Sequence, residues 1–199
     1  VQRNLRKAAM PELIYLVQTF GESTQVAVRS NDEALSVAHV PGTKPRGHGI
    51  TLGRALPLYC TAVGKIILAG MDDAKLHKIA KVLSYEPKTI NTLVSRRAFL
   101  DHIMRVKEQG YAMNNQESEI DIRAIAVPLY NRPGSVLAAL SVSADPDEMT
   151  SEMIARLLPE LRACAERISK AIYERPRRLQ VAAQVGHRTA SWMRSPNQP

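Results

Sequence analysis

The segment from Leu56 to Gly70, LPLYCTAVGKIILAG, carries the first candidate for binding an anion. Thr61 can cap a short helix that runs from Ala62 to Ala69. The first backbone N–H groups of a helix have no partner within it, so they attract a negative charge. The small side chains of Ala62 and Val63 leave room for a ligand carboxylate near those groups. A helix cap that serves only packing is the alternative interpretation.

Two serines on a predicted strand form the second candidate. The run SVLAALSVSA occupies residues 135–144, and side chains alternate between the two faces of a strand. Ser141 and Ser143 are therefore expected on one face together with Leu137 and Ala139. Two hydroxyls on an otherwise apolar face can orient a bound acid. Contact with water near the end of a strand accounts for them equally well.

Arg54 and Tyr59 flank the capped helix in sequence. An arginine there could reach an acidic ligand through a bidentate bond to its carboxylate, and a tyrosine could bind a phenolic group. Solvent-exposed loop residues are the competing interpretation of both.

Enzyme motifs are largely missing, because the sequence lacks HExxH, a Walker phosphate loop, GxSxG and a full GxGxxG. The five histidines are scattered, and none stands at ligand spacing from another. Cys60 and Cys164 lie about half the chain apart without CxxC spacing, which favours two structural thiols. We therefore expect neither a metal nor a cofactor.

The net charge of +8 is concentrated at the carboxyl end. The last 25 residues contain five arginines and no acidic residue, so the rest of the chain carries only about +3. Residues 174–199 have no apolar periodicity, which predicts a basic, mobile tail. A nucleic-acid arm in which Trp192 stacks on bases is the alternative hypothesis for this tail.

Periodicity and turn signals predict helices and strands in a definite order. The helices are expected at residues 3–20, 62–69, 72–82, 95–109 and 151–173, and the strands at 24–28, 34–40, 111–116, 123–130 and 135–143. Residues 41–58 are expected to form an ordered loop. This order predicts an α+β fold, an antiparallel sheet with helices packed on its faces and a hollow for a small ligand. The absence of a signal peptide or an apolar span predicts a cytoplasmic protein and no membrane partner.

Several separated motifs together resemble the effector-binding domain of IclR-type transcriptional regulators. The motifs are LPLYCTAVGKIILA, EQGYAMNNQESEIDIRAIAVPLY and VLAALSVSA, and the resemblance extends over residues 21–173. RALPLYCTAVGK and QESEIDIRAIAVP are most similar to the branch that controls catabolism of aromatic acids through β-ketoadipate.

The resemblance implies a GAF-like fold, homodimers or homotetramers, and a winged helix-turn-helix domain before the sensor. Residues 1–20 would then be the linker helix, and the DNA-binding domain would be absent. Operator DNA would be contacted only through that absent domain. The ligand-binding positions implied are Ala62, Val63, Asn114, Ala124, Ser141 and Ser143. Relatives often have Cys or Ser at Ala124, and many have Gly at Asp121 and Ala144, so one hydrogen bond to the ligand is expected to be missing.

The sequence thus predicts a domain that binds a small organic acid, aromatic or β-ketoadipate-like, to modulate DNA binding, and that is not an enzyme. The alternative is a GAF-like, thiol-dependent enzyme such as a methionine sulfoxide reductase that uses Cys60.

Overall fold

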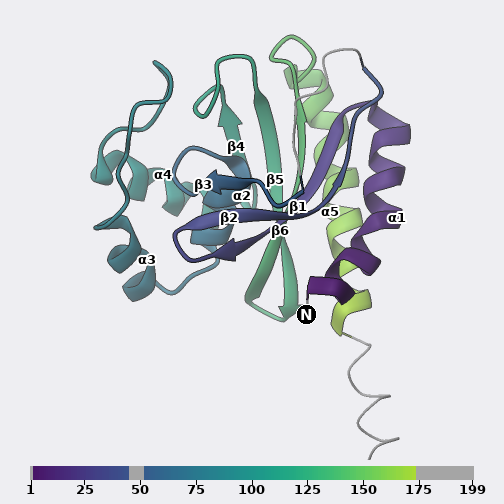
Figure 1. The fold of residues 1–199 in the computed structure, drawn as a ribbon, viewed down its shortest axis with the longest axis horizontal. Helices are drawn as coiled ribbons and strands as arrows, with labels where there is room; N and C mark the ends of the chain where they lie inside the picture. Colours follow the sequence, from purple (N-terminus) through teal and green to yellow (C-terminus); the bar gives the residue numbers. More distant parts are fainter. Residues whose placement is uncertain (1, 45–51, 174–199) are drawn as a thin grey trace, which may run out of the picture.

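The computed structural model describes residues 2–44 and 52–173, and its centre is a curled antiparallel sheet (Figure 1). The six strands follow the order β3-β2-β1-β6-β5-β4 across the sheet. They are β1 (Ser23–Ser30), β2 (Glu33–Val40), β3 (Ala55–Pro57), β4 (Ala112–Asn115), β5 (Arg123–Arg132) and β6 (Ser135–Ala144). Because β1 pairs with β6, the first and last strands in sequence meet at the centre of the sheet.

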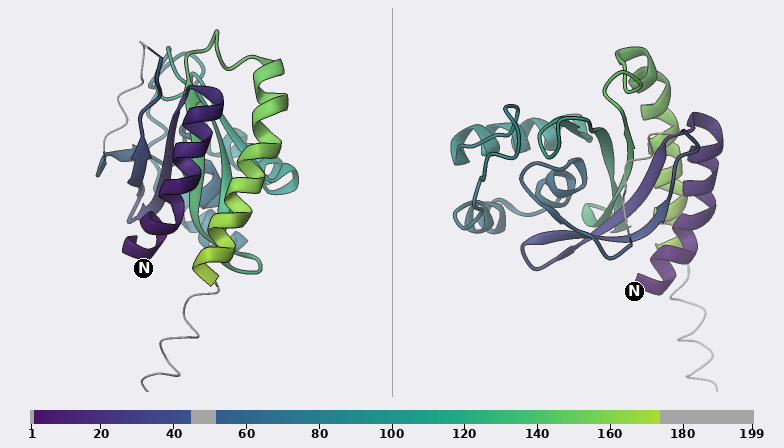
Figure 2. Two further views of the ribbon diagram at one scale, coloured as in Figure 1. Left: turned by 90° about the vertical axis from the view of Figure 1, so that its right-hand side faces the viewer. Right: turned by 45° about the horizontal axis from the view of Figure 1, so that its top comes forward.

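Helices cover both faces of this sheet, which confirms the predicted α+β class. The two long helices, α1 (Gln2–Phe20) and α5 (Ser151–Tyr173), lie side by side on one face (Figure 2). The shorter helices α2 (Ala62–Ala69), α3 (Asp73–Ala80) and α4 (Arg96–Gln109) lie on the other side, and of these α2 packs directly against the sheet.

The central strands present side chains of different size to the two faces. Ile125, Leu140 and Val142 point into the core beneath α1 and α5. Ala126 and Ala139, from the same strands, point into the core beneath α2 and α4. Small side chains let α2 approach the strands closely, so it lies in the hollow of the curled sheet.

The ends of the short helices follow the expected capping chemistry. The Thr61 hydroxyl accepts a hydrogen bond from the backbone N–H of Gly64 at 3.2 Å and so caps α2. Asp72 and Ser95 cap α3 and α4 in the same way. Gly110 ends α4 with a φ of 71°, a conformation that glycine adopts at little cost.

Two local expectations were wrong. The loop expected at residues 41–58 contains a short strand, β3, which pairs with β2. This strand has only three residues, which are too few for an alternating pattern to reveal it. Leu137 packs on the α1 and α5 face instead of sharing a face with Ser141, because the pairing of β5 with β6 skips it. Such a bulge reverses the alternation of side chains on one side of it.

The expectations for the mobile tail and for Trp192 lie outside the described residues. Within the described part of the chain, no helix has both the length and the apolarity needed to cross a membrane.

Gly64 allows α2 to lie against the segment before it. A Cβ atom at this position would lie 2.5 Å from the Cα and the carbonyl oxygen of Leu58, both of which belong to the backbone. Helix propensity alone would favour alanine over glycine by about 1 kcal/mol. We expect the overpacking to outweigh this gain, so that Gly64→Ala lowers the free energy of unfolding by about 1–3 kcal/mol in urea denaturation. A more stable variant would contradict the close approach.

Candidate functional site

A small polar cavity lies between the N-terminus of α2 and the sheet. Its volume is about 50 Å³. The lining residues come from α2 and its cap, from the strands β1, β3, β4, β5 and β6, from the residue before β3 and from the loop after β4: Gln25, Arg54, Leu56, Thr61, Ala62, Val63, Asn114, Ser118, Glu119, Ile122, Ala124, Ser141 and Ser143. Seven of the eight residues that the sequence singled out for ligand binding thus line one cavity.

Strand pairing explains why residues distant in sequence meet here. Ser143 of β6 is the direct partner of Ala124 on β5, and Ala124 is the partner of Asn114 on β4. Ser141 lies two residues before Ser143 on β6, on the same face, and it is the partner of Gln25 on β1. Directly paired residues of an antiparallel sheet have their side chains next to each other on the same face. The floor of the cavity therefore consists of two adjacent rows across the sheet.

Two buried polar atoms of this floor have no hydrogen-bond partner. They are the hydroxyl oxygen of Ser141, a residue that is 1% exposed, and the amide oxygen Oε1 of Gln25, a residue that is 5% exposed. A buried polar atom without a partner costs free energy, and native proteins contain few of them. Two such atoms on residues that line one cavity are typical of a site whose ligand supplies the missing hydrogen bonds.

Asn114 orders the loop after β4. Its side-chain oxygen accepts from the backbone N–H of Glu117 at 2.8 Å, and its amide nitrogen donates to the hydroxyl of Ser118 at 2.7 Å. Asn114 is itself only 2% exposed. It therefore contributes to the site chiefly by fixing the wall that Ser118 forms.

An ion pair stands at the more exposed side of the cavity. The guanidinium group of Arg54 lies 2.7 Å from a carboxylate oxygen of Glu119, and both side chains are exposed to water, at 40% and 50%. An exposed pair of this kind contributes little to stability. The pair between Arg54 and Glu119 can therefore open at small cost.

A buried ion pair that the sequence analysis missed supports the same loop from behind. The ammonium group of Lys65 on α2 is fully buried, and it lies 2.5 Å from Oε1 of Glu117 and 2.9 Å from the carbonyl oxygen of Met113. The backbone of the loop is held further by Thr92, whose hydroxyl donates to the carbonyl of Glu117 at 2.7 Å. Burial lowers the pKa of Lys65, and the adjacent Glu117 carboxylate opposes that shift.

Tyr59 is the one candidate residue that the structure does not bring into the cavity. Its hydroxyl donates to the backbone carbonyl of Glu86 at 2.7 Å, and its ring packs edge-on against Tyr85 with centroids 5.8 Å apart. The chain turns into α2 between Tyr59 and Ala62, so closeness in sequence to the helix cap does not place Tyr59 at the site.

Both cysteines are buried, and they belong to different cores. Cys60 packs with the core beneath α2, whereas Cys164 packs beneath α1 and α5. Burial raises the pKa of Cys60 to about 11, with a further contribution from the charge of Glu117, and it raises the pKa of Cys164 to about 12. Neither thiol forms an appreciable thiolate near neutral pH. Residues 2–44 and 52–173 also contain no cluster of three or more histidine, cysteine or acidic side chains that could hold a metal ion.

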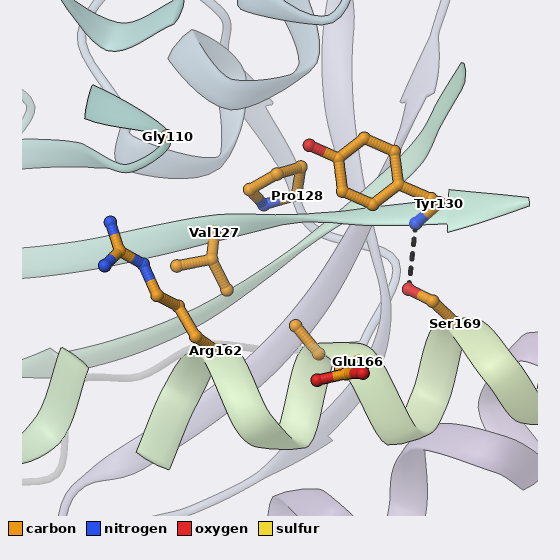
Figure 3. A pocket seen from close by; sticks show the side chains of 8 residues that line it. Gly110, Val127, Pro128, Tyr130, Arg162, Glu166 and Ser169 are labelled. Carbon is orange, nitrogen blue, oxygen red and sulfur yellow. Dashed lines mark hydrogen bonds between the residues drawn. The ribbon is translucent and has the colours of Figure 1, made fainter. Parts of the chain in front are cut away.

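A larger hollow of about 310 Å³ lies between α5 and β5 but lacks these features (Figure 3). It is mostly apolar, and two of the polar side chains at its edge already form hydrogen bonds. The hydroxyl of Ser169 accepts from the backbone N–H of Tyr130 at 2.9 Å, and Arg162 donates to the carbonyl of Gln109 at 2.9 Å. None of the candidate ligand-binding residues lines it, so the smaller polar cavity is the better candidate site.

The fold and the cavity define an α+β domain of the kind that binds small molecules. The family described as bacterial transcriptional regulator IclR C-terminal matches residues 1–170. The chain belongs to this family, which is one of regulators and not of enzymes.

Relatives and solved structures agree with this assignment. The Pca regulon regulatory protein of Pseudomonas putida is 33% identical over 169 residues, which cover 83% of this chain and 58% of that protein. The chain thus spans little more than half the length of this relative. The crystal structure of the Thermotoga maritima IclR is 29% identical, with a TM-score of 0.81 over 85% of this chain and 69% of that one. The inducer-binding domain of the PobR transcription factor from Acinetobacter, a double mutant in complex with 3-hydroxybenzoic acid, is 25% identical, with a TM-score of 0.76 over 82% of this chain and 97% of that one.

The buried ion pair gives a stability prediction. Lys65→Met leaves the buried carboxylate of Glu117 without a cation, so we expect the free energy of unfolding to fall by about 3–5 kcal/mol. The double variant Lys65→Met, Glu117→Leu should be less destabilised than the sum of the two single variants. Urea denaturation measures all three. Lys75→Met is the control, because it removes an exposed pair with Asp72 and should change stability by less than about 0.5 kcal/mol. Equal effects of Lys65→Met and Lys75→Met would contradict this role.

The raised pKa values predict unreactive thiols. At pH 8 neither Cys60 nor Cys164 should react with a disulfide reagent in the folded chain, and both should react in denaturant, since the thiolate is the reactive form. Ser151→Cys places a thiol at an exposed helix start and serves as the positive control. Rapid reaction of the unsubstituted folded chain would show that one buried thiol is activated.

Proposed function

We propose that this domain senses a small organic acid in the cavity between α2 and the sheet and thereby modulates DNA binding by an N-terminal domain. The observation that carries the proposal concerns Ser141, which lines the cavity and has a buried hydroxyl without a hydrogen-bond partner. A ligand that binds there removes the cost of this unpaired group.

The cavity offers complementary groups for an acid. The N-terminus of α2 at Ala62 and Val63 favours negative charge, and the guanidinium group of Arg54 adds a cation. Ser141 and Ser143 supply hydroxyls, while Ala124 and Asn114 continue the floor of the cavity toward β4. Ala124 offers no side-chain hydrogen bond, so the orienting contacts of this proposal come from the serines and from β1.

The volume of the cavity bears on the size of the acid. About 50 Å³ holds an acid of a few atoms, whereas drug-sized ligands occupy pockets of roughly 300 Å³ or more. An aromatic acid therefore requires the wall at Glu119 to move outward and its pair with Arg54 to open. The relative named for the Pca regulon and the PobR domain bound to 3-hydroxybenzoic acid support an aromatic acid.

In this proposal α1 is the linker to the DNA-binding domain, and the sensor forms homodimers or homotetramers. Symmetric regulators meet two-fold DNA sites with paired domains. An acid that binds one arrangement of the linkers more tightly than another shifts the population toward it. Ile14 and Tyr15 of α1 are both about 40% exposed and offer apolar surface for such association.

The thiol-dependent enzyme is the weaker hypothesis. Its nucleophile would be Cys60, which is fully buried and whose pKa is raised to about 11. Cys164 belongs to the core on the opposite face of the sheet and so could not act as its resolving partner without unfolding.

Ligand binding gives the test of the sensor. Protocatechuate, 4-hydroxybenzoate, β-ketoadipate, pyruvate and glyoxylate are screened by thermal shift. An acid at about 100 times its dissociation constant should stabilise the chain by about 2.7 kcal/mol. The double variant Ser141→Ala, Ser143→Ala should lose most of this stabilisation. Ser135→Ala, on the same strand but outside the cavity, should retain it. If no acid raises the melting temperature, or if the double substitution leaves the increase unchanged, the proposed site is wrong.

A further inference from the structure

We infer that Gln25 determines ligand specificity by selecting acids that also carry a hydroxyl group. This inference rests on the proposed function and extends it, because Gln25 of β1 was not among the residues expected to bind the ligand. Gln25 lines the cavity, and its amide oxygen Oε1 is buried and has no hydrogen-bond partner.

The neighbours of Gln25 on β1 show that its lack of a partner is particular to it. Glu22, Ser23, Thr24 and Gln25 are all at most 5% exposed. Glu22 forms an ion pair with Lys44, the hydroxyl of Ser23 accepts from the backbone N–H of Gly42, and the hydroxyl of Thr24 donates to the carbonyl of Leu13. The chain thus satisfies three of four buried polar side chains in succession and leaves an acceptor of the fourth at the cavity.

The unpaired atom specifies the chemistry of the ligand. An amide oxygen only accepts hydrogen bonds, so it repels a carboxylate and requires a donor. Gln25 and Ser141 are direct partners across β1 and β6, which places their side chains next to each other. A ligand hydroxyl between them can donate to Gln25 and accept from Ser141, and both unpaired atoms are then satisfied. The N-terminus of α2 remains for the carboxylate.

Matched acids with and without a hydroxyl test the inference by calorimetric titration. The series are benzoate with 3-hydroxybenzoate and 4-hydroxybenzoate, and propionate with lactate. In the unsubstituted chain we expect at least one hydroxy acid to bind about tenfold more tightly than its parent acid, the difference expected for one buried hydrogen bond.

Gln25→Leu removes the acceptor with little change of volume. The hydroxy acid should then bind no more tightly than its parent acid, while the parent acid binds as before. Gln25→Met is a second variant of similar shape. The unliganded melting temperature of either should not fall, since an unpaired buried polar group is removed. Ser36→Ala is the matched control, because Ser36 on β2 also has a buried, unpaired hydroxyl but does not line the cavity, and it should keep the preference.

The outcomes separate the inference from the function on which it rests. If acids bind but hydroxy and parent acids bind equally, or if both Gln25 variants keep the preference, the role of Gln25 is wrong and the acid site stands. If none of the five probes binds the unsubstituted chain, the inference is overturned, and if the thermal-shift panel also gives no hit, the proposed function is overturned with it. A preference that is lost in the Gln25 variants and retained in Ser36→Ala supports the inference.

Discussion

The ammonium group of Lys65 is the charge around which the candidate site is organised. A charge that is fully withdrawn from water needs an opposite charge and further hydrogen bonds, and Lys65 obtains them from Glu117 and from the carbonyl of Met113. Both partners belong to β4 and the loop after it, so meeting this requirement fixes α2 relative to the loop. The loop carries Ser118 and Glu119 into the cavity wall. One buried charge on a helix thus positions a wall made by a distant segment.

The sheet can enclose this cavity because its two faces carry side chains of different size. Beneath α1 and α5 the strands contribute large apolar side chains such as Ile125 and Leu140 to the core. Toward α2 they contribute alanines and serines, which leave space and carry hydroxyls. The side of the sheet toward α2 therefore has room for Ser141 and Gln25, each of which has a buried atom without a hydrogen-bond partner.

The sequence predicted the features of the site that depend on neighbouring residues in the chain. It did not predict the roles of residues whose partners are distant in sequence. The helix cap at Thr61 and the alternation that places Ser141 and Ser143 on one face are local, and the structure has both. Gln25 and Lys65 owe their roles to partners 116 and 52 residues away, respectively, which no periodicity reports. A lysine within the apolar helix AVGKIILA was nevertheless a usable signal, because a buried lysine is rarely unpaired.

Strand β1 links the candidate site to α1. Its side chains alternate, so Gln25 faces the cavity while Thr24 and Val26 face the opposite core. Thr24 donates a hydrogen bond to the carbonyl of Leu13, and Val26 packs in the same cluster as Leu13. A ligand that forms a hydrogen bond with Gln25 therefore contacts the strand that also packs against α1. Coupling between two sites requires an element whose arrangement both of them bias. In the proposed sensor β1 is the strand that contacts both, the cavity through Gln25 and α1 through Thr24 and Val26.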